Sequence, residues 1–397
     1  MPNLIFKNPP SAEEKIKQMQ ESARFDLGDG DEMVCLAPSN NPKRVPKVFL
    51  SNDCVFDCAY CGCRRSNANA RRYTHTPAEM ADIAVKVAKI SARGVFITSA
   101  IHKNPDYTEE LIIETLRIIR NEHRYAGYVH AKIMPGADSR LIREAGFLAD
   151  RISVNIELPK SEGYKTIAKQ KNKKNIIAPM QTIKNMIQEY NAAGYPKRFA
   201  RSGQTTQMMV GAMRETDKTI ITLSEALYKT FNMKRVYYSP FSPVQECDCL
   251  PGTSTPDWRA RRLYQADMLI KQYDIGAEEI LPGDFDLEYD IDPKAAMALN
   301  NLGMFPVELN GADYETLIRV PGIGTASAMK ILKARREGRV TFEMLKPLGI
   351  SLKRSVFFFT VNGRYFGGKM LDSPRLRSRM ATGPPVDERR FEQLSLY

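Results

Sequence analysis

The stretch "SNDCVFDCAYCGCRRSN", residues 51–67, holds four of the seven cysteines of this 397-residue chain. It follows an apolar run, "KVFLSN" (47–52), that is rich in β-forming residues. Its first three cysteines, Cys54, Cys58 and Cys61, have the spacing C-x3-C-x2-C. Loops that follow the strands of a parallel sheet meet at the end where active sites form. The position of these thiols therefore indicates a functional role.

Six short apolar runs alternate with amphipathic helical patterns along the chain. The runs lie at residues 47–52, 94–100, 128–134, 151–158, 205–211 and 236–241. Most have no polar face, which is typical of strands buried on both sides of a parallel sheet. Repeated alternation predicts right-handed crossovers, but six units are fewer than the eight of a full barrel. We therefore predict an α/β fold, a partial (β/α)6 TIM-like barrel.

The intervening helices have recognisable beginnings. Thr76-Pro77-Ala78-Glu79 is a capping box with proline at the first helical position, so a helix should begin there. A second helix is expected in "TEELIIETLRIIRNEH", with Thr108 as its N-cap. Further amphipathic segments lie at 137–146, 180–194, 215–231 and 257–273.

Charge and hydropathy narrow the class of protein. The formal net charge is +12, which favours an anionic partner such as nucleic acid, although a generally basic surface would also explain it. No apolar run approaches the ~20 residues of a membrane span. The first residues lack the apolar core of a signal peptide. We therefore expect a cytoplasmic protein with no membrane contact, in a compartment where clustered cysteines are more often metal ligands or catalysts than disulfides.

Composition and periodicity divide the chain into five segments. They are an N-terminal extension (1–46), the barrel (47–249), a helical connector (250–305), a small all-α module (306–370) and a basic flexible tail (371–397).

Three thiolates on one loop can hold three irons of a cubane iron–sulfur cluster, which leaves one iron open to a small molecule. A structural zinc site needs four ligands, and Cys63 would have to be the fourth. We favour the cluster and regard Cys63 as a bystander. The pair Cys247 and Cys249 could touch an auxiliary cluster, donate a hydrogen atom or have no role, and we favour no metal there.

The cysteine motif, with Tyr60 just before its third cysteine, resembles that of the radical S-adenosylmethionine superfamily over about residues 45–245. The resemblance implies that Cys54, Cys58 and Cys61 bind a 4Fe–4S cluster. Its open iron would bind the amino and carboxylate groups of S-adenosylmethionine. One electron would then cleave a carbon–sulfur bond and produce a 5′-deoxyadenosyl radical, which takes a hydrogen from the substrate.

Other positions match the superfamily loosely. Ser99 and Ala100 stand where it has a glycine-rich turn, and Met209 with Gly211 resembles its adenine-contact segment, with an acidic residue, Glu215, displaced by one position. A barrel-lining structural role fits these residues equally well. The residues that we assign to the cofactor are Tyr60, Ser99, Ala100, Lys132, Ser153, Asn155, Glu157, Met209 and Gly211.

His130 and Lys132 alternate on the third expected strand and should point into the barrel mouth or lumen. A buried lysine is costly unless it is paired, and Glu157 on the next strand is a candidate partner. Either a structural ion pair or a contact to a substrate carboxylate or phosphate would explain Lys132.

A second motif, "LIRVPGIGTASAMKILKAR" (317–335), reads as helix, glycine-flanked turn and helix. Such a turn exposes successive backbone N–H groups at a helix N-terminus, a geometry that binds phosphate. It resembles the helix–hairpin–helix motif, which reads DNA backbone, although such hairpins also mediate protein contacts. Residues 304–397 carry 16 lysines and arginines against nine acidic residues. The expected DNA contacts are Gly322, Ile323, Gly324, Thr325, Lys330 and Arg335.

Together the two modules resemble radical S-adenosylmethionine proteins described as DNA modification or repair enzymes. Stretches that carry this resemblance include "NDCVFDCAYC", "GYVHAKIMPGA", "QMMVGAMRETD" and "LIRVPGIG". It implies rearrangement, elaboration or repair of a base that is flipped out or single-stranded. It also implies a reductant such as flavodoxin or ferredoxin, and a uracil-DNA-glycosylase-like partner. Two alternatives remain open: an iron–sulfur DNA-binding scaffold, or a radical enzyme that acts on tRNA or a free nucleoside.

Overall fold

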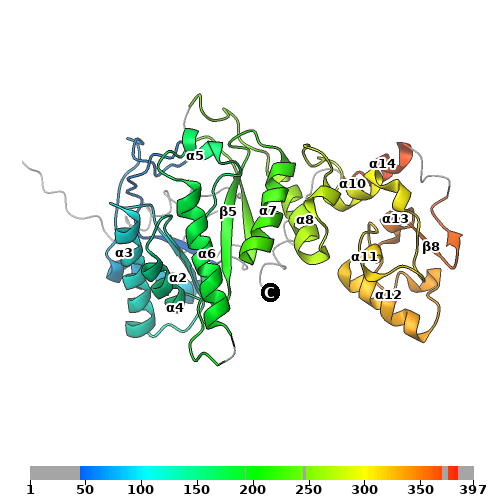
Figure 1. Cartoon of the computed structure of the whole chain (residues 1–397), viewed down its shortest axis with the longest axis horizontal. Helices are drawn as coiled ribbons and strands as arrows, with labels where there is room; N and C mark the ends of the chain where they lie inside the picture. Colours follow the sequence, from blue (N-terminus) through cyan, green and yellow to red (C-terminus); the bar gives the residue numbers. More distant parts are fainter. Residues whose placement is uncertain (1–44, 193, 245–246, 369–373, 383–397) are drawn as a thin grey trace, which may run out of the picture. The chain divides into compact units, whose positions relative to one another are not determined.

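The computed structural model describes residues 45–192, 194–244, 247–368 and 374–382. By internal contacts the chain divides into two compact units (Figure 1). The first consists of residues 1–215 with 227–255, and the second of residues 216–226 with 256–397. Nearly all of the expected N-terminal extension lies outside the described residues. The five-segment division therefore stays a prediction.

The first unit is built on one parallel sheet whose strand order follows the sequence. Every neighbouring pair is parallel, as in the register Val48↔Ile97 or Ala131↔Ile152. This arrangement confirms the partial barrel. The strands are β1 (Lys47–Phe49), β2 (Val95–Thr98), β3 (Val129–Lys132), β4 (Arg151–Ser153), β5 (Gln204–Val210) and β6 (Arg235–Pro240).

Helices connect the strands. They are α2 (Pro77–Ser91), α3 (Pro105–Arg117), a π-helical turn η1 (Ile118–Glu122), α4 (Ser139–Leu148), α5 (Glu162–Thr166), α6 (Lys173–Tyr190) and α7 (Asp217–Phe231). The strands are apolar because they are covered: Ile97, Ala131 and Ile152 are fully buried.

The beginnings of two helices test the capping predictions. At α2 the capping box is confirmed, since the Thr76 side chain accepts from the Glu79 amide at 3.2 Å and Glu79 accepts from the Thr76 amide at 3.0 Å. At α3 the prediction was wrong. Asn104 is the N-cap, and its side chain accepts from the Tyr107 amide at 2.9 Å. Asn104 precedes Pro105, whose fixed φ suits the first helical position, so Thr108 lies inside the first turn.

The second unit begins with α8 (Asp257–Tyr273), which matches the expected helix. The other helical elements are α9 (Ala277–Ile280), α10 (Pro293–Asn300), η2 (Leu302–Met304), α11 (Tyr314–Leu317), α12 (Thr325–Glu337), η3 (Phe342–Met344), α13 (Leu352–Ser355) and α14 (Pro374–Met380).

The expectation of an all-α module was wrong. Strands β7 (Val307–Glu308), β8 (Phe359–Val361) and β9 (Arg364–Tyr365) form a small sheet. The turn between β8 and β9 is Asn362-Gly363, with φ of 53° and 75°. Asn-Gly between apolar residues is a strong hairpin signal, because both residues tolerate positive φ. The sequence contained this signal, and the helical interpretation overlooked it.

One apolar core joins residues 291 to 380 of the second unit. The last part of the expected connector therefore packs in the same core as the expected module. The described start of the expected flexible tail also belongs to it, as helix α14. Leu376 and Met380, four residues apart on this helix, are buried in that core. No described helix is long and apolar enough to cross a lipid bilayer.

Candidate active site

A cavity of about 470 Å³ lies at the carboxyl ends of the six parallel strands. Each strand or the loop after it contributes to the wall, as the sequence position of the cysteine loop predicts. The part of the wall that follows β1 and β2 is Cys54, Phe56, Cys58, Tyr60, Cys61, Cys63, Arg64, Ser99, Ala100 and Ile101. The remainder includes Lys132, Met134, Glu157, Lys171, Gln207, Met209 and residues 239–244.

The three cysteines of the motif are brought together at this cavity. Cys58 is buried, and burial raises the pKa of its thiol to about 11. Burial, followed by the charge of Cys61, also raises the pKa of Cys54. Metal binding requires thiolates, so a positively charged centre has to displace these protons.

Three thiols on one loop are a donor set that suits a cluster, whereas a structural zinc ion takes four ligands. One zinc ion would hold every sulfur at about 2.3 Å, whereas a cluster spreads thiolates over separate irons. In the described ranges no three His, Cys, Asp or Glu side chains are placed to hold one metal ion. Cys63 also lines the cavity and, like Cys58, is buried.

Arg72 organises the cysteine loop and was missed by sequence reasoning. Its guanidinium donates to the carbonyl oxygens of Asn52 (2.7 Å), Cys63 (2.8 Å) and Arg64 (2.6 Å). It also donates to Asn67 at 3.2 Å. A planar fork with five donors suits several convergent carbonyls. In the sequence, Arg72 is the second of two adjacent arginines, and nothing there distinguishes it from Arg71.

A buried ionic network joins the cysteine loop to the segment that follows β4. The predicted pairing of Lys132 with Glu157 is present at 3.9 Å, but Lys171 is closer to the same oxygen at 2.9 Å. Lys171 also donates to the Tyr60 hydroxyl at 3.2 Å. Burial alone would lower the pKa of Lys171, but the charges of Glu157, Tyr60 and Cys58 raise it well above its ordinary value. Lys171 was not foreseen, because it stands in a lysine-rich stretch that reads as surface.

Ser99 carries an unpartnered polar atom into the wall of the cavity. The residue is 5% exposed, and its Oγ has no hydrogen-bond partner among the described residues. A buried hydroxyl normally has a partner, so this atom is suited to a ligand. Ser99 lies directly after β2, and its contact with the cofactor stays a prediction.

Three predicted cofactor residues do not belong to the cavity wall. Ser153 Oγ lies 3.0 Å from His130 Nε2, and Asn155 donates to Gln207, which does line the cavity, at 3.5 Å. His130 stacks on Phe96 at 4.0 Å, and burial holds its pKa well below the usual range.

The third of these residues, Gly211, shapes the turn after β5. Its amide donates to Glu215, which also accepts from the Met213 amide at 3.0 Å. A Cβ on Gly211 would lie 2.0 Å from Thr255 Oγ1, and φ is +88°. Glycine is therefore required here by packing and backbone conformation.

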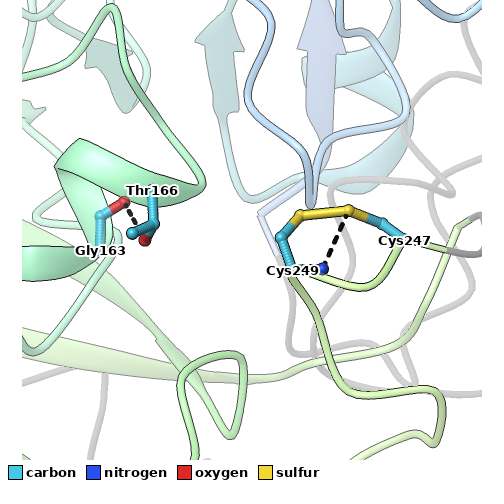
Figure 2. Close-up of a disulfide and its surroundings, with 4 residues drawn as sticks. All are labelled: Gly163, Thr166, Cys247 and Cys249. Atoms are coloured by element: carbon cyan, nitrogen blue, oxygen red, sulfur yellow. Dashed lines mark hydrogen bonds between the residues drawn. A yellow bond between two sulfur atoms is a disulfide. The ribbon is translucent and has the colours of Figure 1, made fainter.

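Figure 2 shows Cys247 and Cys249 joined as a disulfide. The Cys249 amide also donates to Cys247 Sγ at 3.3 Å. The sequence-based roles for this pair did not include this state. Cys249 is exposed, so the sulfurs are accessible to thiols.

The hairpin of the second unit runs from α11 through Val320–Gly324 to α12. Gly322 has φ of +82°, and Gly324 is the N-cap of α12 without a side-chain cap. In the described residues no acceptor is found for the amides of Gly322 and Gly324. The Thr325 amide differs, because it donates to the Tyr273 hydroxyl.

The side chains around the hairpin have different roles. Lys330 is exposed, as a phosphate contact requires. Arg335 donates to the carbonyl oxygens of Leu309 and Ala312, so it braces its own unit. Ile323 is buried, and its carbonyl accepts from Lys294 at 2.5 Å. Sequence reasoning missed Lys294, whose pKa burial lowers to about 7.

A six-stranded parallel half-barrel with three thiols on its first loop defines the class of this unit. Residues 48–227 match the family model described as the Radical SAM superfamily. The chain therefore contains a radical SAM domain, whose cofactors are a 4Fe–4S cluster and S-adenosylmethionine.

Comparison with individual proteins gives partial matches. The chain is 33% identical over 73 residues to the [FeFe] hydrogenase maturase subunit HydE of Thermotoga maritima, which is 18% of this chain and 20% of that protein. The solved structure of the FeFe-hydrogenase maturase HydG from Carboxydothermus hydrogenoformans aligns with a TM-score of 0.44 and 15% identity, over 67% and 58% of the two chains. TsrM from Kitasatospora setae, a radical S-adenosylmethionine methyltransferase, aligns with a TM-score of 0.38 and 11% identity, over 74% and 61%. The chain thus matches less than two thirds of each of these proteins.

The residues present fit these cofactors. Cys54, Cys58 and Cys61 would hold the cluster, and the Ser99 hydroxyl and the Lys132–Glu157–Lys171 network offer polar contacts to S-adenosylmethionine. When bound, the cofactors supply a carbon radical that takes hydrogen from a substrate. The chain's own part is to bind, to orient and to exclude water, for which Phe49, Ile101 and Phe241 provide apolar wall.

Proposed function

We propose that this protein is a radical S-adenosylmethionine enzyme that modifies or repairs a nucleobase in DNA. The barrel carries the radical chemistry, and the hairpin unit binds the DNA backbone. The observation that supports DNA is the hairpin, where the amides of Gly322 and Gly324 lack acceptors at the N-terminus of a 13-residue helix. Backbone amides at a helix N-terminus favour an anion such as phosphate.

The charge around the hairpin supports the same partner. Helix α12 exposes Lys330, Lys333 and Arg336, which can neutralise phosphates without reading sequence. The proposal therefore assigns non-specific backbone binding to this unit. Selection of the base is left to the cavity.

A base stacked in a duplex cannot enter a cavity at the end of a barrel. The substrate base is therefore flipped out or comes from a single strand. The reaction is a rearrangement, elaboration or repair of that base, and the electron comes from a small reductant protein such as flavodoxin or ferredoxin. The proposal also includes a uracil-DNA-glycosylase-like partner.

The decisive experiment is mass spectrometry of nucleosides from the DNA of cells that express or lack the protein. The proposal is supported if the amount of one nucleoside depends on the protein. Cells that express Cys58→Ala should then match cells that lack the protein. The same dependence in tRNA alone would assign the enzyme to RNA. Modification of DNA at the normal level by Cys58→Ala would show that the cysteine assignment is wrong.

A second assay separates chemistry from binding. Anaerobically reconstituted protein with dithionite and S-adenosylmethionine should release 5′-deoxyadenosine. If it binds DNA but releases none, the protein is an iron–sulfur scaffold. Removing residues 306–397 is not a usable way to separate DNA binding from chemistry. The cut would pass through the apolar core that joins residues 291 to 380.

A further inference from the structure

Arg64 is a buried cation in the wall of the cavity. It is 5% exposed and lies three residues after Cys61, whose carbonyl accepts from Arg64 Nη1 at 3.2 Å. Its Nε is buried and has no hydrogen-bond partner among the described residues. Its neighbour Arg65 has the same side chain but is exposed.

The other charges of the cavity do not compensate Arg64. The charged side chains of the wall are Arg64, Lys132, Lys171 and Glu157, and the two lysines share the single carboxylate. In the described part of the chain no carboxylate forms an ion pair with Arg64. The pKa of Asp57 is lowered chiefly by hydrogen bonds from Ser66, and Arg64 contributes less.

A buried guanidinium without a counter-charge costs several kcal/mol, so the position favours an anionic occupant of the cavity. Three thiolates around an iron–sulfur core provide this negative charge beside the same loop. Because reduction adds a further electron, a nearby cation stabilises the reduced state more than the oxidised state.

We propose that Arg64 is the counter-cation of the cluster and raises its reduction potential. Its charge and its free Nε–H donor favour the reduced state from which the electron leaves for S-adenosylmethionine. This inference rests on the radical SAM domain and is independent of whether the substrate is DNA.

The test compares Arg64→Gln with Arg65→Gln, which removes the same charge from the exposed neighbour. The cluster potential is measured by EPR-monitored redox titration of reconstituted protein without S-adenosylmethionine. We expect Arg64→Gln to make reduction about tenfold less favourable, a downward shift of about 59 mV for one electron. Arg65→Gln should shift much less, because its charge is screened by water. Equal shifts in the two variants, or no shift in Arg64→Gln, would overturn the proposal.

Thermal stability gives a second readout that a merely structural arginine would not reproduce. The cluster-free Arg64→Gln protein should melt no lower than the cluster-free wild type, since it no longer buries an unpaired charge. The increase in Tm that the cluster brings should be smaller in the variant. A cluster-free variant that is strongly destabilised would point to a structural brace and contradict the proposal.

If Arg64→Gln takes up no iron, its potential cannot be measured, and Arg64→Lys is tested instead. This variant keeps the charge and loses the fork geometry. Iron uptake restored by lysine supports the counter-cation role. If Arg64→Lys and Arg64→Gln both fail to take up iron, the counter-cation role is refuted.

Discussion

At the scale of single residues, the candidate site depends on charges buried in pairs. Lys171 is 10% exposed, and it contacts both Glu157 on the strand side and Tyr60 on the cysteine loop. It therefore links the two walls of the cavity. Removing one partner of a buried pair leaves an uncompensated charge, which costs more than the pair contributes.

We expect Lys171→Met to destabilise the cluster-free protein by about 3 kcal/mol, the low end for a broken buried pair because Lys132 remains near Glu157. Urea unfolding followed by circular dichroism measures this loss. The exposed Lys169→Met is the matched control and should change stability by less than about 0.5 kcal/mol. Similar values for the two variants would mean that the network does not stabilise the fold.

Lys294 predicts a pH dependence in the second unit. Burial lowers its pKa from 10.5 to about 7, so the unfolded chain binds the proton more tightly than the folded one. Stability then rises with pH between about 7 and 10.5, by up to about 1.4 kcal/mol per pH unit. Lys294→Met should therefore stabilise the protein most below pH 7, and this gain should shrink as the pH rises.

The single tryptophan, Trp258, lies on α8 of the same unit and can report its unfolding in urea at each pH. A gain from Lys294→Met that stays constant from pH 6 to pH 10 would contradict the lowered pKa.

At the scale of elements, the turn between α11 and α12 depends on one glycine. Gly322 has φ of +82°, and a Cβ there would lie 3.0 Å from the Ser351 carbonyl oxygen and 3.2 Å from Ser355 Cβ. A residue with a side chain is strained in this conformation, and the neighbouring atoms are largely backbone. The conformation of this turn is therefore tied to α13 as well as to its own sequence.

We predict that Gly322→Ala lowers the free energy of unfolding by about 1–2 kcal/mol. Gly338→Ala is the control, because Gly338 follows α12 with extended backbone and has no atom within 4 Å of an added Cβ. Trp258 fluorescence in urea measures both. If the two alanine variants are equally stable, the positive φ of Gly322 is not a constraint.

At the scale of the whole molecule, a net charge of +12 favours binding of a polyanion. The dependence of this binding on salt concentration can be measured. Every phosphate contact releases counterions, so binding weakens linearly in log salt concentration. The contributions of individual lysines to that slope show where the polyanion binds. Charge-reversal variants can therefore locate the surface that binds the polyanion.

We expect Lys330→Glu to weaken binding to short duplex and single-stranded DNA and to reduce the salt slope by about 1. Lys86→Glu makes the same charge change on an exposed position of α2 in the barrel unit, and it should leave the slope within error. Fluorescence anisotropy across a salt series provides the comparison. The hairpin assignment fails if both substitutions act equally.

Local patterns in the sequence predicted much of the barrel. The strands β1 to β6 and the capping box of α2 follow from periodicity and from contacts within a few residues. The cysteine spacing predicted that three thiols would lie together, because residues on one short loop remain close in space. Their assignment as cluster ligands stays a prediction. Errors arose where a local signal was passed over, as at Asn362-Gly363 and at the Leu376–Met380 stripe of α14.

The sequence by itself determined which segments become strands and helices and which loop carries the sulfur, because these choices depend on neighbours along the chain. Only the tertiary structure decided which side chains face the cavity. It placed Arg64 and Lys171 there and left Ser153 and Asn155 outside the wall. These outcomes depend on contacts such as Lys171 with Tyr60, over 100 positions apart, whose burial and pairing no local pattern encodes.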